Sequence, residues 1–245
     1  MQNLTLSLNE EAGELRRAFE KHGVLVFPDA LSPRKLRNLN AEIAAHCEPI
    51  VEDAERERES STTRIGFDVE VVPWDPIADG SQVFARLAED PVLRGLTESV
   101  LGPGFGAPRA LVMRSVGGGN GQAWHQDCPP DDPEAFNLNR LFYMQDTHEE
   151  DGAIVVVPGS HRTGRIPSGG SQESIDGEQV LTPTAGTLVL LHGHVFHRVT
   201  PNRSGKPRVS VNLRAYPPGV SDQVNRIGIY RNGAYDFAEG RRLDR

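Results

Sequence analysis

The first hundred residues carry hydrophobic positions at helical spacing. Leu15, Ala18 and Phe19 recur at intervals of three to four residues, which is typical of one face of an amphipathic helix. Ser7 followed three residues later by Glu10 predicts a capping box at the start of this helix. The chain is therefore expected to open with a helix whose hydrophobic side packs against the rest of the protein.

Glycine and proline mark the next boundaries. Gly23 predicts the end of the first helix, and the run Val-Leu-Val-Phe at 24–27 predicts a short buried strand. Ser32 before Pro33 predicts the start of a second helix that continues to about His46. Residues 52–61 are densely charged, and we expect them to form a solvated helix end or a mobile loop. A further helical pattern covers residues 82–101.

After residue 102 the pattern changes to short hydrophobic runs between turns rich in glycine and proline. Many short strands with such turns predict a sandwich or a barrel, and helices followed by strands predict α+β packing. We expect one domain over residues 1–245, mainly β, with a helical part over about 1–102 and a strand core over about 103–220. The expected strands are 110–116, 141–145, 153–157, 187–191, 195–199 and 209–216.

Composition and charge limit the classes of partner. A formal net charge of −8 argues against nucleic acid as the main partner. With only Cys47 and Cys128, a disulfide framework is not expected, and a reducing compartment is the simpler interpretation. The N-terminus has no hydrophobic leader, and no run is long enough to cross a membrane. The sequence therefore predicts a cytoplasmic protein without a membrane partner, and it indicates nothing about oligomeric state.

One histidine and one carboxylate stand in a pattern that suits a metal. His125 and Asp127 are separated by one residue after a β-type run, so a strand would place both on the same side. Two imidazoles and one carboxylate on one face of the ion are the ligands of non-haem Fe(II) enzymes. Similar pairs arise by chance at 46–48 and 148–150, and we expect both of these at the surface.

Three later histidines compete for the position of the third ligand, namely His192, His194 and His197. A turn at 201–205 follows His197 directly, and Arg208 opens the next strand. A cosubstrate that binds the metal at one end and a cation at the other needs the histidine and the arginine on neighbouring strands that a short turn joins. An inward arginine in a strand is costly unless it is paired, so Arg208 is expected to bind a carboxylate.

Several segments resemble the phytanoyl-CoA dioxygenase (PhyH) family of Fe(II)/2-oxoglutarate-dependent oxygenases. They are Trp-His-Gln-Asp at 124–127, the segment 151–161 that ends in Pro-Gly-Ser-His, and the segment 197–208. Residues 19–28 resemble the opening helix and strand of that family. The resemblance implies a double-stranded β-helix, or cupin-like jelly roll, with flanking N-terminal helices and its core at about 103–220.

The resemblance also implies roles for particular residues. His125, Asp127 and His197 become the catalytic iron ligands, and Arg208 becomes the partner of the distal 2-oxoglutarate carboxylate. Ser210, on the same side of the strand as Arg208, is expected to assist in binding the cosubstrate. His161 has a structural place in a turn in the family. One departure is Val199, where members often carry a small hydroxyl residue.

The expected function follows from these roles. The resemblance implies Fe(II), 2-oxoglutarate and O₂, with ascorbate as an auxiliary reductant, and the release of succinate and CO₂. We expect hydroxylation of an unactivated C–H bond in a small organic substrate, with a natural-product intermediate preferred. Desaturation, epoxidation, cyclisation and a fatty acyl-CoA substrate stay open. In a different class, the chain would be a non-catalytic metal-binding jelly-roll module.

Regions around the site are assigned from composition alone. The loop 166–179 is rich in glycine and serine and is expected to form a lid, and residues 64–74 are expected to form the other lip. Four arginines are candidates either for meeting an anionic substrate or for solvated surface positions, namely Arg64, Arg114, Arg140 and Arg165.

Overall fold

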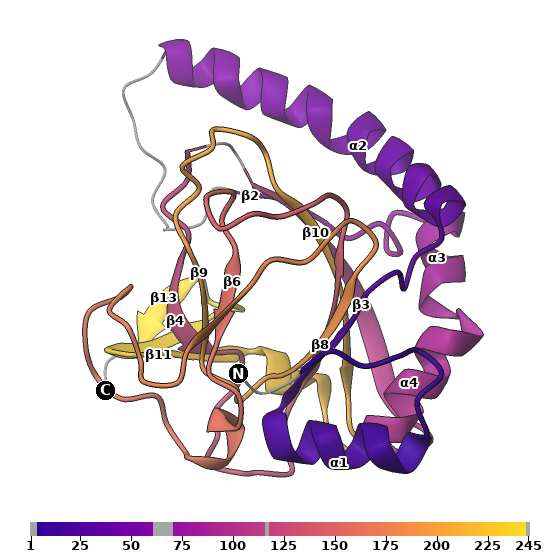
Figure 1. Cartoon of the computed structure of the whole chain (residues 1–245). Coiled ribbons are helices and arrows are strands. Elements are labelled where there is room, and N and C mark those ends of the chain that lie inside the picture. The colour runs from indigo at the N-terminus through magenta and orange to yellow at the C-terminus, as the bar shows by residue number, and fades with distance from the viewer. Residues whose placement is uncertain (1–3, 61–70, 116–117, 244–245) are drawn as a thin grey trace.

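The computed structural model describes residues 4–60, 71–115 and 118–243. Figure 1 shows its helices on the outside of a core of strands. Within the described residues no helix has a stretch long and apolar enough to cross a membrane. The α-helices are α1 (Ala12–His22), α2 (Pro33–Ser60), α3 (Gln82–Ala88) and α4 (Pro91–Leu101).

The first helix ends as predicted but begins differently. Gly23 takes a φ of 67°, and its N–H donates to the carbonyl of Phe19, which is the left-handed cap that favours glycine. The predicted capping box of Ser7 and Glu10 is wrong. The residue at the N-cap is Glu11, whose side chain makes no capping hydrogen bond.

Helix α2 begins at Pro33 as predicted, and the Ser32 hydroxyl accepts a hydrogen bond from the backbone N–H three residues later. The helix continues to Ser60, well beyond the predicted end at His46. Of the two alternatives for the charged segment, residues 52–60 therefore form the end of the helix.

The helix predicted over 82–101 is in fact two helices, because the Asp-Pro pair starts a new one. The Asp90 carboxylate accepts hydrogen bonds from the N–H groups of Val92 (3.0 Å) and Leu93 (3.3 Å). Pro91 occupies the first helical position, where a missing N–H costs nothing. Hydrophobic periodicity alone did not reveal this break.

Two antiparallel sheets form the body of the protein. The first sheet contains β1 (Val24–Phe27), β8 (Leu188–His192), β5 (Leu138–Tyr143), β10 (Val209–Tyr216), β3 (Gly106–Ser115) and β2 (Val71–Trp74), in that order. The second contains β13 (Arg241–Leu243), β12 (Gly233–Asp236), β11 (Ile227–Tyr230), β4 (Gln122–Gln126), β9 (His197–Val199), β6 (Ile154–Val156) and β7 (Gln179–Leu181). Short 3₁₀ helices, η1 (Ser160–Arg162) and η2 (Asp222–Asn225), lie in the connections.

The two sheets pack against each other through one cluster of side chains. Val24 and Leu141 of the first sheet pack with Ile154 and Val156 of the second. A larger cluster on the other face of the first sheet includes residues of all four helices. One sheet thus has helices on its outside and the second sheet on its inside, and the predicted mainly β jelly roll with flanking helices is confirmed.

The strand content exceeds the prediction at the C-terminus. Three strands, β11 to β13, lie beyond the predicted core limit of residue 220. Strand β11 pairs with β4, and Tyr230 stands opposite His125 in the register. The last part of the chain therefore lies directly beside the candidate metal ligand.

Three histidines outside the candidate site pack together. The ring of His192 stacks on Phe136 with 3.8 Å between the ring centroids. The ring centroids of His161 and His194 each lie 4.9 Å from that of His192. Burial lowers the pKa of His161 to about 4 and also lowers the pKa of His192 and of His194. All three rings are therefore neutral in the folded protein at neutral pH.

This cluster predicts a loss of stability in acid. In the unfolded chain a histidine has a pKa near 6.5, so below that pH the unfolded state binds more protons than the folded state. The free energy of unfolding should hold above a pH of about 6.5 and fall as the pH falls toward about 4, by up to about 1.4 kcal/mol per pH unit for each histidine. Denaturant titration at several pH values measures the slope. His161→Asn should reduce it, the exposed His148→Asn should not, and a flat wild-type profile would contradict the account.

Candidate metal centre

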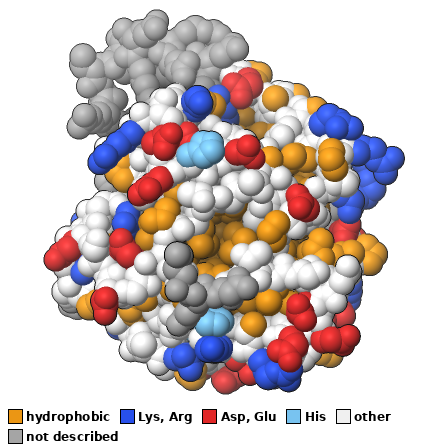
Figure 2. All heavy atoms as spheres, in the orientation of Figure 1, with side chains coloured by type: hydrophobic (Ala, Val, Ile, Leu, Met, Phe, Trp, Pro, Cys, Tyr) orange, Lys and Arg blue, Asp and Glu red, His pale blue; other side chains and the backbone are white. Residues whose placement is uncertain are grey.

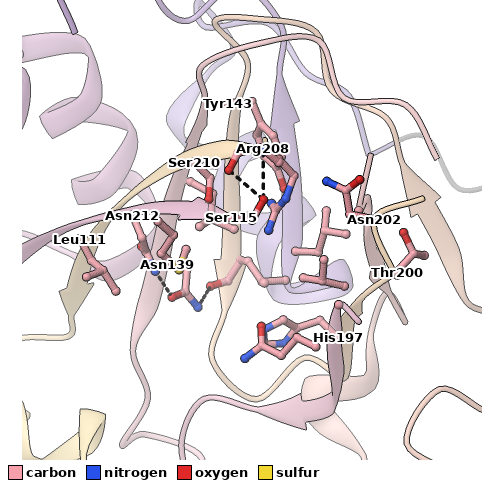
Figure 3. A pocket seen from close by; sticks show the side chains of 18 of the residues that line it. Leu111, Ser115, Asn139, Tyr143, His197, Thr200, Asn202, Arg208, Ser210 and Asn212 are labelled. Atoms are coloured by element: carbon pink, nitrogen blue, oxygen red, sulfur yellow. Dashed lines mark hydrogen bonds between the residues drawn. The ribbon is translucent and has the colours of Figure 1, made fainter. Parts of the chain in front are cut away.

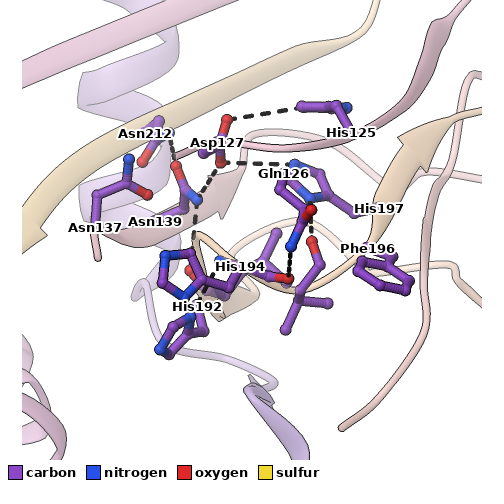
Figure 4. Close-up of polar contacts among 12 residues, drawn as sticks. His125, Gln126, Asp127, Asn137, Asn139, His192, His194, Phe196, His197 and Asn212 are labelled. Carbon is purple, nitrogen blue, oxygen red and sulfur yellow. Dashed lines mark hydrogen bonds and ion pairs between the residues drawn. The ribbon is translucent and has the colours of Figure 1, made fainter. Parts of the chain in front are cut away.

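Two adjacent strands bring the predicted ligands together. His125 lies near the end of β4, Asp127 follows that strand, and His197 opens β9. The register pairs His125 directly with His197. The Asp127 carboxylate lies 3.7 Å from Nε2 of His125 and 3.6 Å from Nε2 of His197, and all three ligand atoms lie within 4.8 Å of one another (Figure 4). The cluster could hold a metal ion.

Both imidazoles are oriented by the backbone. Nδ1 of His125 lies 2.8 Å from the carbonyl oxygen of Ala123, and Nδ1 of His197 lies 2.9 Å from that of Val195. Because a carbonyl only accepts, each Nδ1 donates, and each Nε2 keeps its lone pair for a metal. Burial, with the neighbouring His197, lowers the pKa of His125 to about 3. Neutral imidazoles are the form that binds a metal.

The carboxylate is ionised in spite of its burial. Burial of Asp127 opposes ionisation, but Arg214, the two histidines and a hydrogen bond from Asn139 outweigh it and hold its pKa far below the usual range. The Arg214 guanidinium lies 2.9 Å from one carboxylate oxygen, and the Asn139 amide donates to the other at 2.6 Å. A charged oxygen ligand is therefore present without a metal.

A cavity between the two sheets extends from this cluster. Its volume is about 120 Å³, roughly ten times what a single water needs, so it can hold a small organic molecule. Figure 2 shows a hollow with hydrophobic side chains around it on one face of the protein. The hydrophobic side chains that line the cavity are Leu111, Met113, Leu141, Ile154, Leu191 and Val199.

Arg208 lies at the other end of the cavity, away from His197 (Figure 3). The side chain is buried, and its guanidinium makes no hydrogen bond or ion pair with the residues that the structure describes. Burial lowers the pKa of Arg208, partly offset by the nearby Tyr143. The Ser210 hydroxyl beside it is also buried and has no partner in the described chain. A buried cation and hydroxyl without partners are what an anionic ligand would satisfy.

The competing histidines lie elsewhere. Figure 4 shows His192 and His194 apart from the His125–Asp127–His197 group. In the part of the chain that the structure describes, only that group brings together three possible ligands. His46 stacks on Trp74 at 4.1 Å, and His148 is exposed, so neither look-alike pair forms a site.

Three of the arginines considered for an anionic substrate have other contacts. Arg114 pairs with Glu48 through two hydrogen bonds of 2.9 Å, and the exposed Arg165 pairs with Asp131. Arg140 is buried in the fold, where it donates to the carbonyl of Leu213 at 2.6 Å. None of the three lines the cavity, so the structure does not support a role for them at a substrate there, and Arg64 lies outside the described residues.

None of the residues of the loop 166–179 lines the cavity, so the structure does not support the prediction that it forms a lid. Arg231 donates hydrogen bonds to four of its carbonyl groups, and Trp124 donates to the carbonyl of Glu173. The loop is therefore fastened to the C-terminal strands. Most of the second predicted lip, 64–74, lies outside the described residues, and Trp74 at its end is buried in the core beneath the helices.

Sequence reasoning missed the polar residues around the carboxylate and at the far end of the cavity. Asn139 and Tyr143 lie on β5, and Arg214 lies on β10. The signal for Arg214 was present, since Arg208, Ser210, Asn212 and Arg214 alternate with hydrophobic residues. Such alternation places four polar side chains on one face of a strand.

The fold and the three-residue cluster define a jelly-roll protein with a candidate non-haem iron site. A model of the phytanoyl-CoA dioxygenase (PhyH) family matches residues 19–210, well over half of the chain. The chain belongs to this family. The predicted membership of this family is thereby confirmed.

Curated relatives are distant and longer. Ectoine dioxygenase of Halomonas elongata is 26% identical over 220 residues, which cover 78% of this chain and 65% of that protein. L-proline trans-4-hydroxylase of Streptomyces griseoviridis is 28% identical over 166 residues, which cover 53% of this chain and 61% of that protein. The chain thus spans less than two thirds of the length of these two relatives.

Solved structures share the fold. The epimerase SnoN in complex with Fe³⁺, α-ketoglutarate and nogalamycin RO has a TM-score of 0.64 at 19% identity, covering 90% of this chain and 86% of that chain. HygX from Streptomyces hygroscopicus with nickel and 2-oxoglutarate has a TM-score of 0.63 at 18% identity, covering 83% and 86%. At this level of identity the similarity supports the jelly-roll fold.

The geometry makes a prediction about which histidine binds metal. His197→Ala should weaken anaerobic Fe(II) binding by more than about a hundredfold, because it removes a ligand rather than a supporting partner. His192→Ala should leave the Fe(II) affinity unchanged. Equilibrium dialysis under nitrogen measures both, with circular dichroism to verify folding. The reverse order of effects would contradict the assignment.

Proposed function

We propose that this protein is an Fe(II)- and 2-oxoglutarate-dependent oxygenase that hydroxylates a C–H bond of a small organic substrate. One observation carries the proposal. A buried group of two imidazoles and a carboxylate stands at one end of a cavity, and the buried Arg208, without a counter-ion in the described residues, stands at the other. 2-Oxoglutarate, with a chelating group at one end and a carboxylate at the other, matches this arrangement.

His125, Asp127 and His197 would hold the metal through Nε2, a carboxylate oxygen and Nε2. Their chemistry fits Fe(II), because two imidazoles and one carboxylate leave the opposite face open. When bound with 2-oxoglutarate and O₂, the iron supplies the oxidation of the C–H bond while the cosubstrate becomes succinate and CO₂. The protein contributes position and a partly dehydrated cavity.

Arg208 would bind the distal carboxylate of the cosubstrate by charge-assisted hydrogen bonds. Ser210 of β10 and Tyr143 of the neighbouring strand β5 offer hydroxyl groups, and both residues line the cavity. Burial raises the pKa of Tyr143 to about 12, so the phenol keeps its proton to donate. Val199 lines the same cavity without a hydroxyl, so Ser210 and Tyr143 would supply the hydroxyl groups for the cosubstrate.

The hydrophobic side chains of the cavity would exclude bulk water from the reacting centre. Leu141 and Ile154 come from opposite sheets, and Leu191 lines the cavity beside Leu141. A low-polarity wall strengthens the interaction between Arg208 and a carboxylate, because fewer waters compete for it.

The substrate is proposed to be a small molecule, preferably a natural-product intermediate. The names of the relatives, ectoine dioxygenase and L-proline hydroxylase, and the nogalamycin complex of SnoN support a small substrate. Desaturation, epoxidation, cyclisation and a fatty acyl-CoA substrate would use the same ligand set. The free cysteines Cys47 and Cys128 fit a cytoplasmic setting, where thiols stay reduced.

Succinate formation tests the proposal. The iron-loaded protein is incubated with 2-oxoglutarate, O₂ and a panel that includes ectoine, L-proline and a fatty acyl-CoA. A true substrate should stimulate succinate release and gain one oxygen atom, whereas desaturation or cyclisation would remove two hydrogens. Iron-loaded protein that neither binds 2-oxoglutarate nor forms succinate would instead indicate a non-catalytic jelly-roll module.

Arg208 gives a sharper prediction. Arg208→Met should raise the Kd for 2-oxoglutarate by more than about tenfold, because hydrogen bonds to charged groups each contribute roughly 1.5–3 kcal/mol. Fe(II) affinity should stay unchanged. Isothermal titration of metal-loaded protein measures the Kd, and Arg165→Met, which removes an exposed arginine outside the cavity, is the matched control. An unchanged Kd in Arg208→Met would contradict the assignment.

A further inference from the structure

The guanidinium of Arg214 is part of the metal centre without being a candidate ligand. Its Nη2 lies 2.9 Å from one oxygen of Asp127, its Nε lies 3.0 Å from the amide oxygen of Asn139, and its Nη1 lies 3.4 Å from the amide oxygen of Asn225. The side chain is 22% exposed and that of Asp127 is 8% exposed. All three nitrogens of the group are therefore directed at named acceptors.

The surrounding amides fix this arrangement. Asn139 donates to the second oxygen of Asp127 at 2.6 Å and accepts hydrogen bonds from both Arg214 and Asn212. Its amide therefore has only one useful orientation. Each carboxylate oxygen of Asp127 thus has its own donor, which is the arrangement that a buried anion requires.

The charges at the centre cancel without a metal. Each histidine donates through Nδ1 to a backbone carbonyl, and Asp127 is the acidic residue of the cluster, paired with Arg214. In the described part of the chain, Arg214 is the sole lysine or arginine within ion-pair distance of that carboxylate. A divalent cation that enters would therefore meet a carboxylate already paired with a positive charge.

We infer that Arg214 is the internal counter-ion of Asp127, which stabilises the metal-free centre and lowers its affinity for a divalent cation. The inference rests on the proposed metal site. A buried carboxylate without a partner is strongly destabilising, so a centre that loses its metal needs another positive charge. The positive charge of Arg214 also repels an incoming cation, so it lowers the affinity of the centre for the metal while it stabilises the metal-free centre.

This role belongs to a part of the chain that the family model does not cover. The match ends at residue 210, whereas Arg214 and its partner Asn225 lie beyond it. Asn225 ends the short helix η2, and it also accepts a hydrogen bond from Asn137. The segment after β10 therefore contributes an acceptor to the guanidinium of Arg214.

Stability of the metal-free protein is the first test. Arg214→Met should lower the thermal midpoint of the metal-free protein by roughly 5 °C or more, since it leaves a buried carboxylate unpaired. In the Asp127→Asn background the same substitution should have little effect, because no charge remains to be neutralised. Equal losses in both backgrounds would show that Arg214 acts independently of Asp127 and would overturn the inference.

A variant that does not fold is also informative. If Arg214→Met yields no folded protein without metal, the double variant Asp127→Asn with Arg214→Met should restore folding. Arg214→Lys keeps the charge and should lose less stability than Arg214→Met. Failure of the double variant to fold would overturn the inference, because the defect would then not come from the unpaired carboxylate.

Metal affinity is the second test, with Mn(II) as the probe, because the free ion has an EPR signal. Arg214→Met should bind Mn(II) about tenfold more tightly than the wild type, since a nearby positive charge is gone. Arg214→Lys should stay close to the wild type, and Arg165→Met should match it. Weaker binding in Arg214→Met would show that the arginine positions the ligand and would overturn its assignment as a counter-ion.

The two tests separate this inference from the proposed function. If the wild type binds neither Mn(II) nor Fe(II), the proposed metal site fails, and the coupling between Arg214 and Asp127 in the metal-free protein can still be measured. If the metal binds but the two substitutions are additive in stability, the proposed function stands and the counter-ion does not.

Discussion

A charged carboxylate in the interior of a jelly roll has to be compensated, and the centre of this protein is organised around that requirement. Asp127 is almost fully buried, and its two oxygens receive hydrogen bonds from Arg214 and Asn139. Two imidazoles stand within reach of the same carboxylate. The candidate metal site, the polar face of β10 and, through Arg214, Asn225 of the short helix after it are all connected to this one buried charge.

Strand pairing explains how residues distant in sequence meet. The register of β4 with β9 sets His125 opposite His197, and the register of β10 with β5 sets Ser210 opposite Tyr143. The two sheets then enclose a cavity with a chelating group at one end and a cation at the other. Small errors in either register would turn these side chains out of the cavity, because side chains alternate between faces.

The sequence predicted the parts of this account that depend on local chemistry. The alternation at 125–127 indicated His125 and Asp127, the turn after His197 favoured that histidine over its competitors, and the family resemblance completed the choice of the three residues that the structure brings together. The split of the helix at Asp90 comes from the local Asp-Pro pair, which hydrophobic periodicity overlooks. The fastening of the loop 166–179 by Arg231 and the pairing of Arg114 with Glu48 depend on contacts between distant segments. Hydrophobic periodicity and composition carry no information about such contacts, and those predictions were incomplete or wrong.

The central claim is that iron and 2-oxoglutarate bind together in this cavity. Anaerobic titration of the metal-free protein with Fe(II), followed by 2-oxoglutarate, tests it through the weak visible charge-transfer band of the chelate. The account predicts a band that needs both components, is absent in His197→Ala and is weakened in Arg208→Met. A wild-type protein fully loaded with iron that shows no band on addition of 2-oxoglutarate would contradict it.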